Sequence, residues 1–204
     1  MAERYRRRSA LAHLGLEARA SAAAGDAGVT LRESPMRGLL VLRGDAAGAE
    51  FRGAVAAVLG LEPVVEPLTS ARRRDVSMLW LGPDEWLVVT PPNVQAWLID
   101  SLEASLEDVH ASVTDLTGGY TTISLSGPRA RDVLAKGCPL DLHPAVFSPG
   151  DCAQTLVAKA GAMIRCVDDS PSFELVVRRS FAEYAALWLG DAALEYGGGL
   201  APNG

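Results

Sequence analysis

The stretch VTDLTGGYTTISLSGPRARDVLAKGCPLDLHPAVFSPGD, residues 113–151, contains the pattern that decides the fold. Residues 113–116 alternate in character and predict a short strand, and residues 120–125 predict a second one. The pair Gly118-Gly119 lies between them and favours a tight turn. The stretch therefore begins with two consecutive strands, and it contains neither a nucleophile paired with a base nor a set of metal ligands.

A helix over residues 127–136 is expected after the second strand. Pro128 suits the first helical position, and three apolar residues then recur at the i, i+3, i+4 spacing of a surface helix. Gly137 favours the left-handed backbone that ends a helix, and a proline two positions later prevents its continuation. A proline-rich loop is expected to fill residues 139–151.

The rest of the chain shows the same order of elements twice. In the first half, apolar patterns predict strands over residues 38–43, 76–81 and 85–90 and helices over residues 45–59 and 93–107. The second half adds strands over residues 152–158, 163–167 and 173–177 and a final helix. Asp45 and Asn93 are the predicted N-caps of the first two helices. Ser180 opens the final helix and is predicted to form a capping box with Glu183.

The two halves align as copies of one unit. Residues 39–51 lie over residues 122–134, and residues 78–102 lie over residues 163–189. Glycine and aromatic positions agree although identity is low, and each copy is a whole unit and not a short solenoid repeat. The pattern predicts an α+β fold: a duplicated β-α-β-β-α unit with mostly antiparallel sheets and helices packed on them.

We expect one compact domain overall, built from four segments. Residues 1–35 contain only short apolar pieces and predict an N-terminal arm of irregular structure that lies over another surface. The first repeat is expected over residues 36–112 and the second over residues 113–196. Residues 197–204 are rich in glycine and predict a flexible tail. The tryptophans fall on faces consistent with cores: Trp80, Trp86, Trp97 and Trp188.

Composition argues against several classes of function. A formal net charge of −6 disfavours a nucleic-acid binder, which normally carries a basic face. No apolar run approaches the roughly 20 residues that span a bilayer, and the arginine-rich start lacks the apolar core of a secretory signal. Cys138, Cys152 and Cys166 form no close pair and indicate a reducing compartment. We therefore expect a cytoplasmic protein with no nucleic-acid and no membrane partner.

The common catalytic and cofactor motifs are missing from the sequence. It has no GxxxxGK[ST] loop, and no GxGxxG follows a strand. His13, His110 and His143 lie in different regions, and none has a second ligand at metal-binding spacing. Ser126 precedes a helix and is not part of a G-x-S-x-G elbow. The sequence therefore predicts no catalytic, no cofactor-binding and no metal-binding residue.

Two residues leave a choice between structure and chemistry. Cys138 could be a reactive thiol beside Lys136, but it follows a helix C-terminus, where a thiol pKa is not lowered. A small buried hydrophobic residue is the preferred interpretation. Asp115 could anchor an amine or a pterin ring. An aspartate just before a Gly-Gly turn commonly bonds the backbone of that turn, and we prefer this structural role.

Arg72, Arg73 and Arg74 form the candidate interaction site. They lie in a predicted loop between the first helix and the strand over residues 76–81. A basic run in a loop is usually only solvated. In a net-acidic protein it can instead meet an acidic patch of a partner, so we regard the three arginines as a possible partner interface.

Parts of both halves of the chain resemble a known protein family. DLTGGYTTISLSGPRARDVLAKGCPLDLHPAVFSPGDCAQT (residues 115–155), followed by FELVVRRSFAEYAALWL (residues 173–189), resembles the gamma-subunit family of heterotetrameric sarcosine oxidases. LWLGPDEWLVV (residues 79–89) also fits. The resemblance covers about residues 30–195. Its most specific parts are CPLDLHP, the F-x-x-G-x-C-A-Q-T run and the R-S-F-A-E helix start.

The resemblance implies a fold like the folate-binding domain of glycine-cleavage aminomethyltransferases, itself a duplicated α+β unit. It also implies a complex that oxidatively demethylates sarcosine to glycine, yielding hydrogen peroxide and 5,10-methylenetetrahydrofolate. FAD, FMN, NAD and tetrahydrofolate would lie on the alpha and beta subunits and zinc on the delta subunit. The gamma chain would be an accessory subunit without a catalytic residue.

The alternative is a stand-alone folate-binding or aminomethyltransferase-like protein of the same fold. One such family has a K-G-C-[aromatic]-x-G-Q-[acidic] motif, but here Lys136-Gly137-Cys138 continues with Pro139. The aminomethyltransferases would show a G-Y-T-G-E-x-G-[aromatic]-E-I-like stretch. The corresponding residues 167–175 keep the aromatic residue and the acid and lose the glycines. Both departures favour the subunit interpretation.

Overall fold

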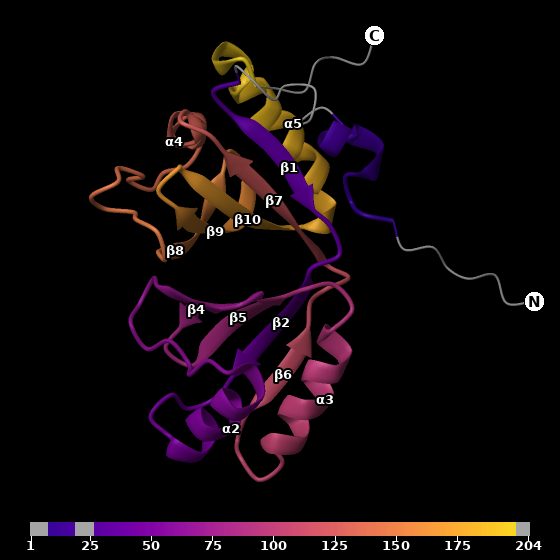
Figure 1. The fold of residues 1–204 in the computed structure, drawn as a ribbon, viewed down its shortest axis with the longest axis vertical. Helices are drawn as coiled ribbons and strands as arrows, with labels where there is room; N and C mark the ends of the chain where they lie inside the picture. Colours follow the sequence, from indigo (N-terminus) through magenta and orange to yellow (C-terminus); the bar gives the residue numbers. More distant parts are fainter. Residues whose placement is uncertain (1–7, 19–26, 199–204) are drawn as a thin grey trace, which may run out of the picture.

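Two five-stranded antiparallel sheets face each other in the computed structural model, which describes residues 8–18 and 27–198 (Figure 1). The first sheet has the strand order β3-β4-β5-β2-β6. Its strands are β2 (Gly38–Arg43), β3 (Ser70–Arg73), β4 (Val76–Gly82), β5 (Glu85–Thr90) and β6 (Ser112–Asp115). The second sheet has the order β1-β7-β10-β9-β8. Its strands are β1 (Thr30–Ser34), β7 (Tyr120–Ser126), β8 (Cys152–Val157), β9 (Ala160–Asp168) and β10 (Ser172–Arg178).

The duplicated unit is visible in these strand orders. Reversed, the first sheet reads β6-β2-β5-β4-β3, which matches β1-β7-β10-β9-β8 position by position. The edge strand before each unit is exchanged, because β1 precedes β2 in the chain but pairs with β7, while β6 precedes β7 but pairs with β2. The predicted α+β fold with antiparallel sheets is confirmed.

The exchange corrects two segment predictions. Residues 1–35 are not irregular throughout, because β1 is a regular strand of the second sheet in register with β7. The segment assigned to the second repeat, residues 113–196, begins inside β6, which belongs to the first sheet. Within the described residues the chain crosses between the sheets twice, at residues 35–37 between β1 and β2 and at the turn over residues 116–119 between β6 and β7. The rest of the predicted arm and tail, residues 1–7, 19–26 and 199–204, lies outside the described residues.

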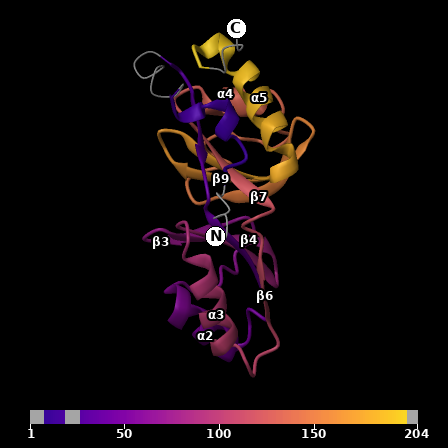
Figure 2. The same cartoon turned by 90° about the vertical axis from the view of Figure 1, so that its right-hand side faces the viewer.

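Four α-helices that lie wholly within the described residues cover the sheet faces that point away from the other sheet (Figures 1 and 2). They are α2 (Ala49–Leu59), α3 (Gln95–Ser105), α4 (Ala130–Ala135) and α5 (Ala182–Ala192). Short 3-10 turns add η1 (Ala12–Leu14), η2 (Arg179–Phe181) and η3 (Leu194–Tyr196). Among the described residues, no helix has both the length and the apolar character needed to cross a membrane.

Strand alternation divides the apolar residues into three layers. On β2, Leu40 and Leu42 point to the core under α2 and α3. Leu39 and Val41, which alternate with them, point to a separate core between the sheets. The core of the second half lies under α4 and α5 and is the largest of the three clusters. The order of layers is therefore helices, sheet, sheet and helices.

The helix ends differ from the predicted caps in three places. Asp45 accepts a hydrogen bond from the Ala47 amide and lies before α2, whose N-cap is Gly48. Asn93 has a positive φ of 68° and precedes Val94, the N-cap of α3. The Ser180 capping box does not form, because Ser180 lies inside η2 and α5 begins after Phe181.

Two glycines after predicted helices have different structural roles. Gly60 ends α2 with a φ of 67°, as expected for a left-handed cap. Gly137, by contrast, does not have a positive φ. A Cβ at Gly137 would lie 2.5 Å from the ring of Trp188, so this glycine permits close packing of α5. Our prediction of a left-handed Gly137 is wrong.

The tryptophan prediction holds for Trp86, which is fully buried, and fails for Trp97. Trp97 is 64% exposed on α3, while the neighbouring Gln95 is buried. The apolar face of α3 is therefore rotated relative to the predicted one.

Candidate functional site

Arg72 and Arg73 lie on the edge strand β3, and Arg74 lies in the turn to β4 with a φ of 52°. The prediction of a loop at this position is therefore wrong for Arg72 and Arg73. All three side chains are exposed. None of them forms an ion pair with an acidic side chain of the described residues.

The three arginines have different local contacts. The Nη1 atom of Arg73 donates to the Gly60 carbonyl, at 2.7 Å, and so neutralises part of the negative end of the α2 dipole. The Nε atom of Arg72 donates to the Arg74 carbonyl at 2.9 Å. Arg73 therefore supports the fold, whereas the outer nitrogens of Arg72 and the side chain of Arg74 remain available to a partner.

Arg72 also lines a shallow cavity of about 290 Å³ with the end of the proline-rich loop. Pro149 and Gly150 form one side of this cavity and the buried Arg165 forms another. The edge of β3 is joined to the loop by the Ser70 amide, which donates to the Gly150 carbonyl at 2.7 Å. The structure thus brings together the basic segment and the proline-rich loop, which the sequence analysis treated separately.

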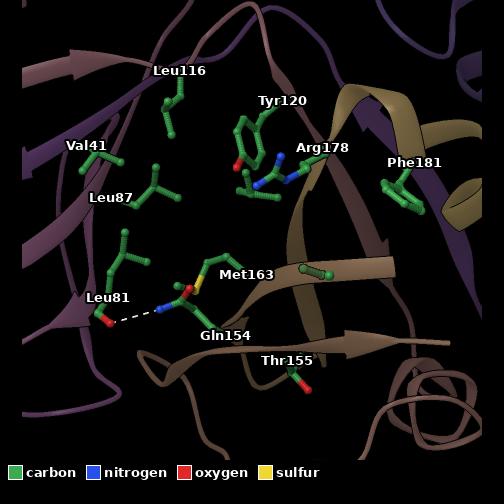
Figure 3. Close-up of a pocket in the computed structure, with 13 residues that line it drawn as sticks. Val41, Leu81, Leu87, Leu116, Tyr120, Gln154, Thr155, Met163, Arg178 and Phe181 are labelled. Atoms are coloured by element: carbon green, nitrogen blue, oxygen red, sulfur yellow. Dashed lines mark hydrogen bonds between the residues drawn. The ribbon is translucent and has the colours of Figure 1, made fainter. Parts of the chain in front are cut away.

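A second cavity, of about 320 Å³, lies between the two sheets, and we call it the inter-sheet cavity (Figure 3). Most of its lining is apolar. Side chains of the first sheet, including Leu81 and Leu87, face side chains of the second, including Met163 and Tyr120. The sequence alone does not reveal this cavity, because alternation along a strand does not show which two sheets face each other.

The polar groups of the inter-sheet cavity are few. The guanidinium of Arg178 lies 5.9 Å from the ring centre of Tyr120, in a cation–π arrangement. The Nε2 atom of Gln154 donates to the Leu81 carbonyl at 3.0 Å and ties β8 to the first sheet. Arg178 is therefore the one charged residue among the residues that line this cavity.

The three cysteines are free thiols and all are buried. Burial raises the pKa of Cys152 to about 11, and its Sγ donates to the Thr69 carbonyl at 3.1 Å. Burial also raises the pKa of Cys166, and the nearby Arg131 guanidinium opposes this rise. A thiol with a raised pKa is a poor nucleophile at neutral pH. Cys138 is 6% exposed, and the interpretation as a small buried hydrophobic residue agrees with this position.

The three histidines lie in separate regions. His13 is in η1 beside Glu183, at 3.2 Å, and His110 is exposed in the segment before β6. The Nδ1 atom of His143 accepts a hydrogen bond from the Ala145 amide. Within residues 8–18 and 27–198, no group of three or more His, Cys, Asp or Glu side chains could hold a metal ion.

Asp115 has the structural role that we preferred. Its Oδ1 atom accepts a hydrogen bond from the Thr117 amide at 2.8 Å, at a point where the chain crosses between the sheets. Asp168 makes a similar turn, and hydrogen bonds from Ser170 lower the pKa of the Asp168 carboxyl. Neither carboxylate points to a substrate-binding role.

The N-terminal segment and the proline-rich loop both pack on the second half of this chain. Leu11, Leu14 and Leu16 are buried in its core. Arg131 holds the loop with bonds to the carbonyls of Leu142, at 2.5 Å, and Phe147, at 2.8 Å. The buried apolar residues of these two segments are therefore covered by the second half of this chain itself.

Comparison with known proteins identifies the family. The sequence model of the sarcosine oxidase, gamma subunit family matches residues 43–195. The gamma subunit of sarcosine oxidase from Corynebacterium sp. (strain U-96) is 34% identical over 191 residues, which cover 93% of this chain and 91% of that protein. The corresponding subunit from Corynebacterium sp. (strain P-1) is 37% identical over 120 residues, which cover 59% of this chain and 58% of that protein.

Two solved structures show the same fold. A chain of heterotetrameric sarcosine oxidase from Corynebacterium sp. U-96, in complex with pyrrole 2-carboxylate, matches with a TM-score of 0.83 and 34% identity. The match covers 96% of this chain and 98% of that one. The glycine cleavage system aminomethyltransferase T from Bartonella henselae matches with a TM-score of 0.63 and 18% identity, covering 90% of this chain and 50% of that one.

The structural match to the aminomethyltransferase confirms the predicted fold relationship and, at its low identity, nothing beyond the fold. The resemblance noted in CPLDLHP and the neighbouring motifs is confirmed by the family match and by the full-length relatives. The chain belongs to the sarcosine oxidase gamma subunit family.

Proposed function

We propose that this chain is the accessory gamma subunit of a heterotetrameric complex that oxidatively demethylates sarcosine to glycine. Hydrogen peroxide and 5,10-methylenetetrahydrofolate are the other products of the proposed reaction. The observation that carries the proposal is the full-length match, in sequence and structure, to one chain of a heterotetrameric sarcosine oxidase. The site geometry agrees with an accessory role, because the thiols are buried and Asp115 is used in a turn.

The proposed partners are the alpha, beta and delta subunits of the same oxidase. We assign FAD, FMN, NAD and tetrahydrofolate to the alpha and beta subunits and zinc to the delta subunit. The residues described in this chain do not fit these groups: no acidic, Cys or His cluster among them suits zinc. The inter-sheet cavity offers a single cation and no glycine-rich phosphate loop. A cytoplasmic location agrees with three unpaired thiols in the described chain.

Co-expression with the other three subunits is expected to yield one complex that contains flavin and produces peroxide when sarcosine is added. The chain purified alone should show neither flavin absorbance nor sarcosine-dependent peroxide. Size-exclusion chromatography, the visible spectrum and a peroxide assay measure the three properties. Flavin or peroxide production by the isolated chain would contradict the accessory role, and failure of the wild-type chain to enter the complex would contradict subunit membership.

We also propose that the basic segment Arg72, Arg73 and Arg74 contacts an acidic patch of another subunit. Its support is the exposure of all three side chains without an internal ion pair. Opposite charges across an interface mainly raise the association rate and are weakened by salt.

The double substitution Arg72→Glu/Arg74→Glu is expected to slow association with the other subunits about tenfold at low salt. Arg73 is left unchanged because its guanidinium caps the α2 carbonyl end. Arg52→Glu, on the exposed face of α2, is the control that reverses the charge of one exposed arginine elsewhere on the surface. Surface plasmon resonance at two salt concentrations measures the rates. Equal rates for the double variant and the control would remove the basic segment from the interface.

A further inference from the structure

Large apolar side chains are exposed at one end of the inter-sheet cavity. Leu156 on β8 is 50% exposed, Phe181 is 43% exposed and Tyr184 on α5 is 38% exposed. Phe181 also lines the cavity (Figure 3). Tyr184 is held at the β8–β9 hairpin, because its Oη atom accepts a hydrogen bond from the Lys159 amide at 3.3 Å. We call these three side chains the cavity rim. Leu156 lies on β8, Tyr184 contacts the β8–β9 hairpin and Phe181 lines the same cavity as Gly161 of β9, and exposed apolar side chains gathered in this way mark interaction sites.

A glycine with open space beside it lies next to the rim. Gly161 lies opposite Leu156 in the β8–β9 pairing and belongs to the cavity lining. A Cβ at this position would meet no atom within 4 Å, so open space adjoins the strand here. The opening leads to the apolar walls formed by Leu81, Leu87 and Met163. An apolar side chain from outside could therefore enter the cavity at Gly161.

The single cation of the inter-sheet cavity indicates which charged group it would bind. No acidic residue lines the cavity, and Arg178 has no ion pair with a described acidic side chain. Its guanidinium lies over Tyr120, which leaves its N–H groups available at the edge of the ring. Arginine in such a position binds a carboxylate with directional, charge-assisted hydrogen bonds.

We propose that the inter-sheet cavity and its rim form a docking site for a segment of another subunit of the oxidase. The segment would place a bulky apolar side chain through the opening at Gly161 and a carboxylate at Arg178. A protein segment fits better than a small acid, because a small molecule inside the cavity would leave Leu156 and Tyr184 exposed to water. Side chains that anchor in such pockets supply much of the binding energy of an interface. The inference rests on the proposed function, since it requires the complex.

The substitution Gly161→Leu tests the opening directly. A Cβ at this position meets no atom within 4 Å, and glycine weakens the interior of a strand, so the variant is expected to fold. Gly53→Leu is the matched control, because Gly53 lies on the exposed face of α2 and a Cβ there also meets nothing within 4 Å. Binding of each full-length variant to the complex of the other three subunits is measured by titration calorimetry. We expect Gly161→Leu to weaken the affinity about tenfold or more and Gly53→Leu to leave it unchanged.

A second substitution, Arg178→Glu, tests the carboxylate and is also expected to weaken the affinity about tenfold. Unchanged affinity for both Gly161→Leu and Arg178→Glu would overturn the docking site. The proposed function would still stand in that case, because it requires only that the wild-type chain assembles. If the wild-type chain does not assemble, the proposed function and the docking site fall together. Benzoate is the small-molecule probe: saturable binding of benzoate that Gly161→Leu abolishes, with assembly unaffected, would replace the docking site by a site for aromatic acids.

Discussion

Replacement of Trp86 by alanine is expected to lower the free energy of unfolding by about 3–5 kcal/mol. Trp86 is fully buried on β5, its ring centre lies 5.6 Å from that of Phe51, and its Nε1 atom donates to the Val64 carbonyl at 2.8 Å. The substitution leaves a large cavity under α2 and an unpaired carbonyl. Domains of this kind are stable by about 5–15 kcal/mol, so the variant should lose a large share of its stability.

The effect is measurable as a lower melting temperature. With about 2–4 °C lost per kcal/mol for a chain of this size, we expect a fall of roughly 6–20 °C by calorimetry or circular dichroism. Trp97→Ala is the matched control, because the same side chain is removed from a site that is 64% exposed. The control should change stability by less than about 0.5 kcal/mol. Equal losses for the two variants would contradict the observed burial difference.

Local patterns predicted the inner strands well. The strands β2 and β5 have the predicted bounds, β4 and β7 differ by one residue at one end, and β9 begins three residues earlier than predicted. These strands are apolar on both faces or alternate strongly, since they lie between a helix layer and the inter-sheet core. Burial of both faces makes a strand visible in the sequence.

Edge strands carry less of this signal. The sequence of β1, TLRES, has one buried residue, Leu31, and β3, SARR, has none. Both were predicted as irregular segments. The pairing of β6 with β2 instead of β7 was also unpredictable, because a short strand before a turn can pair with either sheet. Tertiary contacts decide that choice.

The helix ends and the inter-sheet cavity could not be predicted from local sequence patterns either. Asp45 and Ser180 have the residue types of N-caps, yet the backbone turns into the helix two or more residues later. The arginine segment was found from composition, but the role of Arg73 at Gly60 depends on a neighbour thirteen residues away. The inter-sheet cavity requires the relative placement of two sheets, and no local pattern of residues contains that information.

Glu174→Ala is expected to destabilise the protein by about 3 kcal/mol, because it removes the partner of a buried cation. Arg165 is 4% exposed, and its Nη2 atom lies 2.5 Å from the Oε2 atom of Glu174 on the adjoining strand. The Nε atom of Arg165 has no hydrogen-bond partner among the described residues. Without Glu174, few interactions would offset the cost of burying the Arg165 charge. The expected loss is at the lower end of the usual range, because Arg165 also lines the cavity beside Arg72, where water can enter.

The double substitution Arg165→Met/Glu174→Leu separates the charge from the packing. If the cost of Glu174→Ala comes from an unpaired buried charge, removal of both charges should restore most of the stability. Urea unfolding of the single and double variants measures the difference. Glu183→Ala is the surface control, since Glu183 and His13 are both more than half exposed, and such pairs contribute about 0–1 kcal/mol. If the double variant has a lower free energy of unfolding than Glu174→Ala, removing both charges does not restore stability. The ion pair would then stabilise the contact between β9 and β10 through its hydrogen-bond geometry.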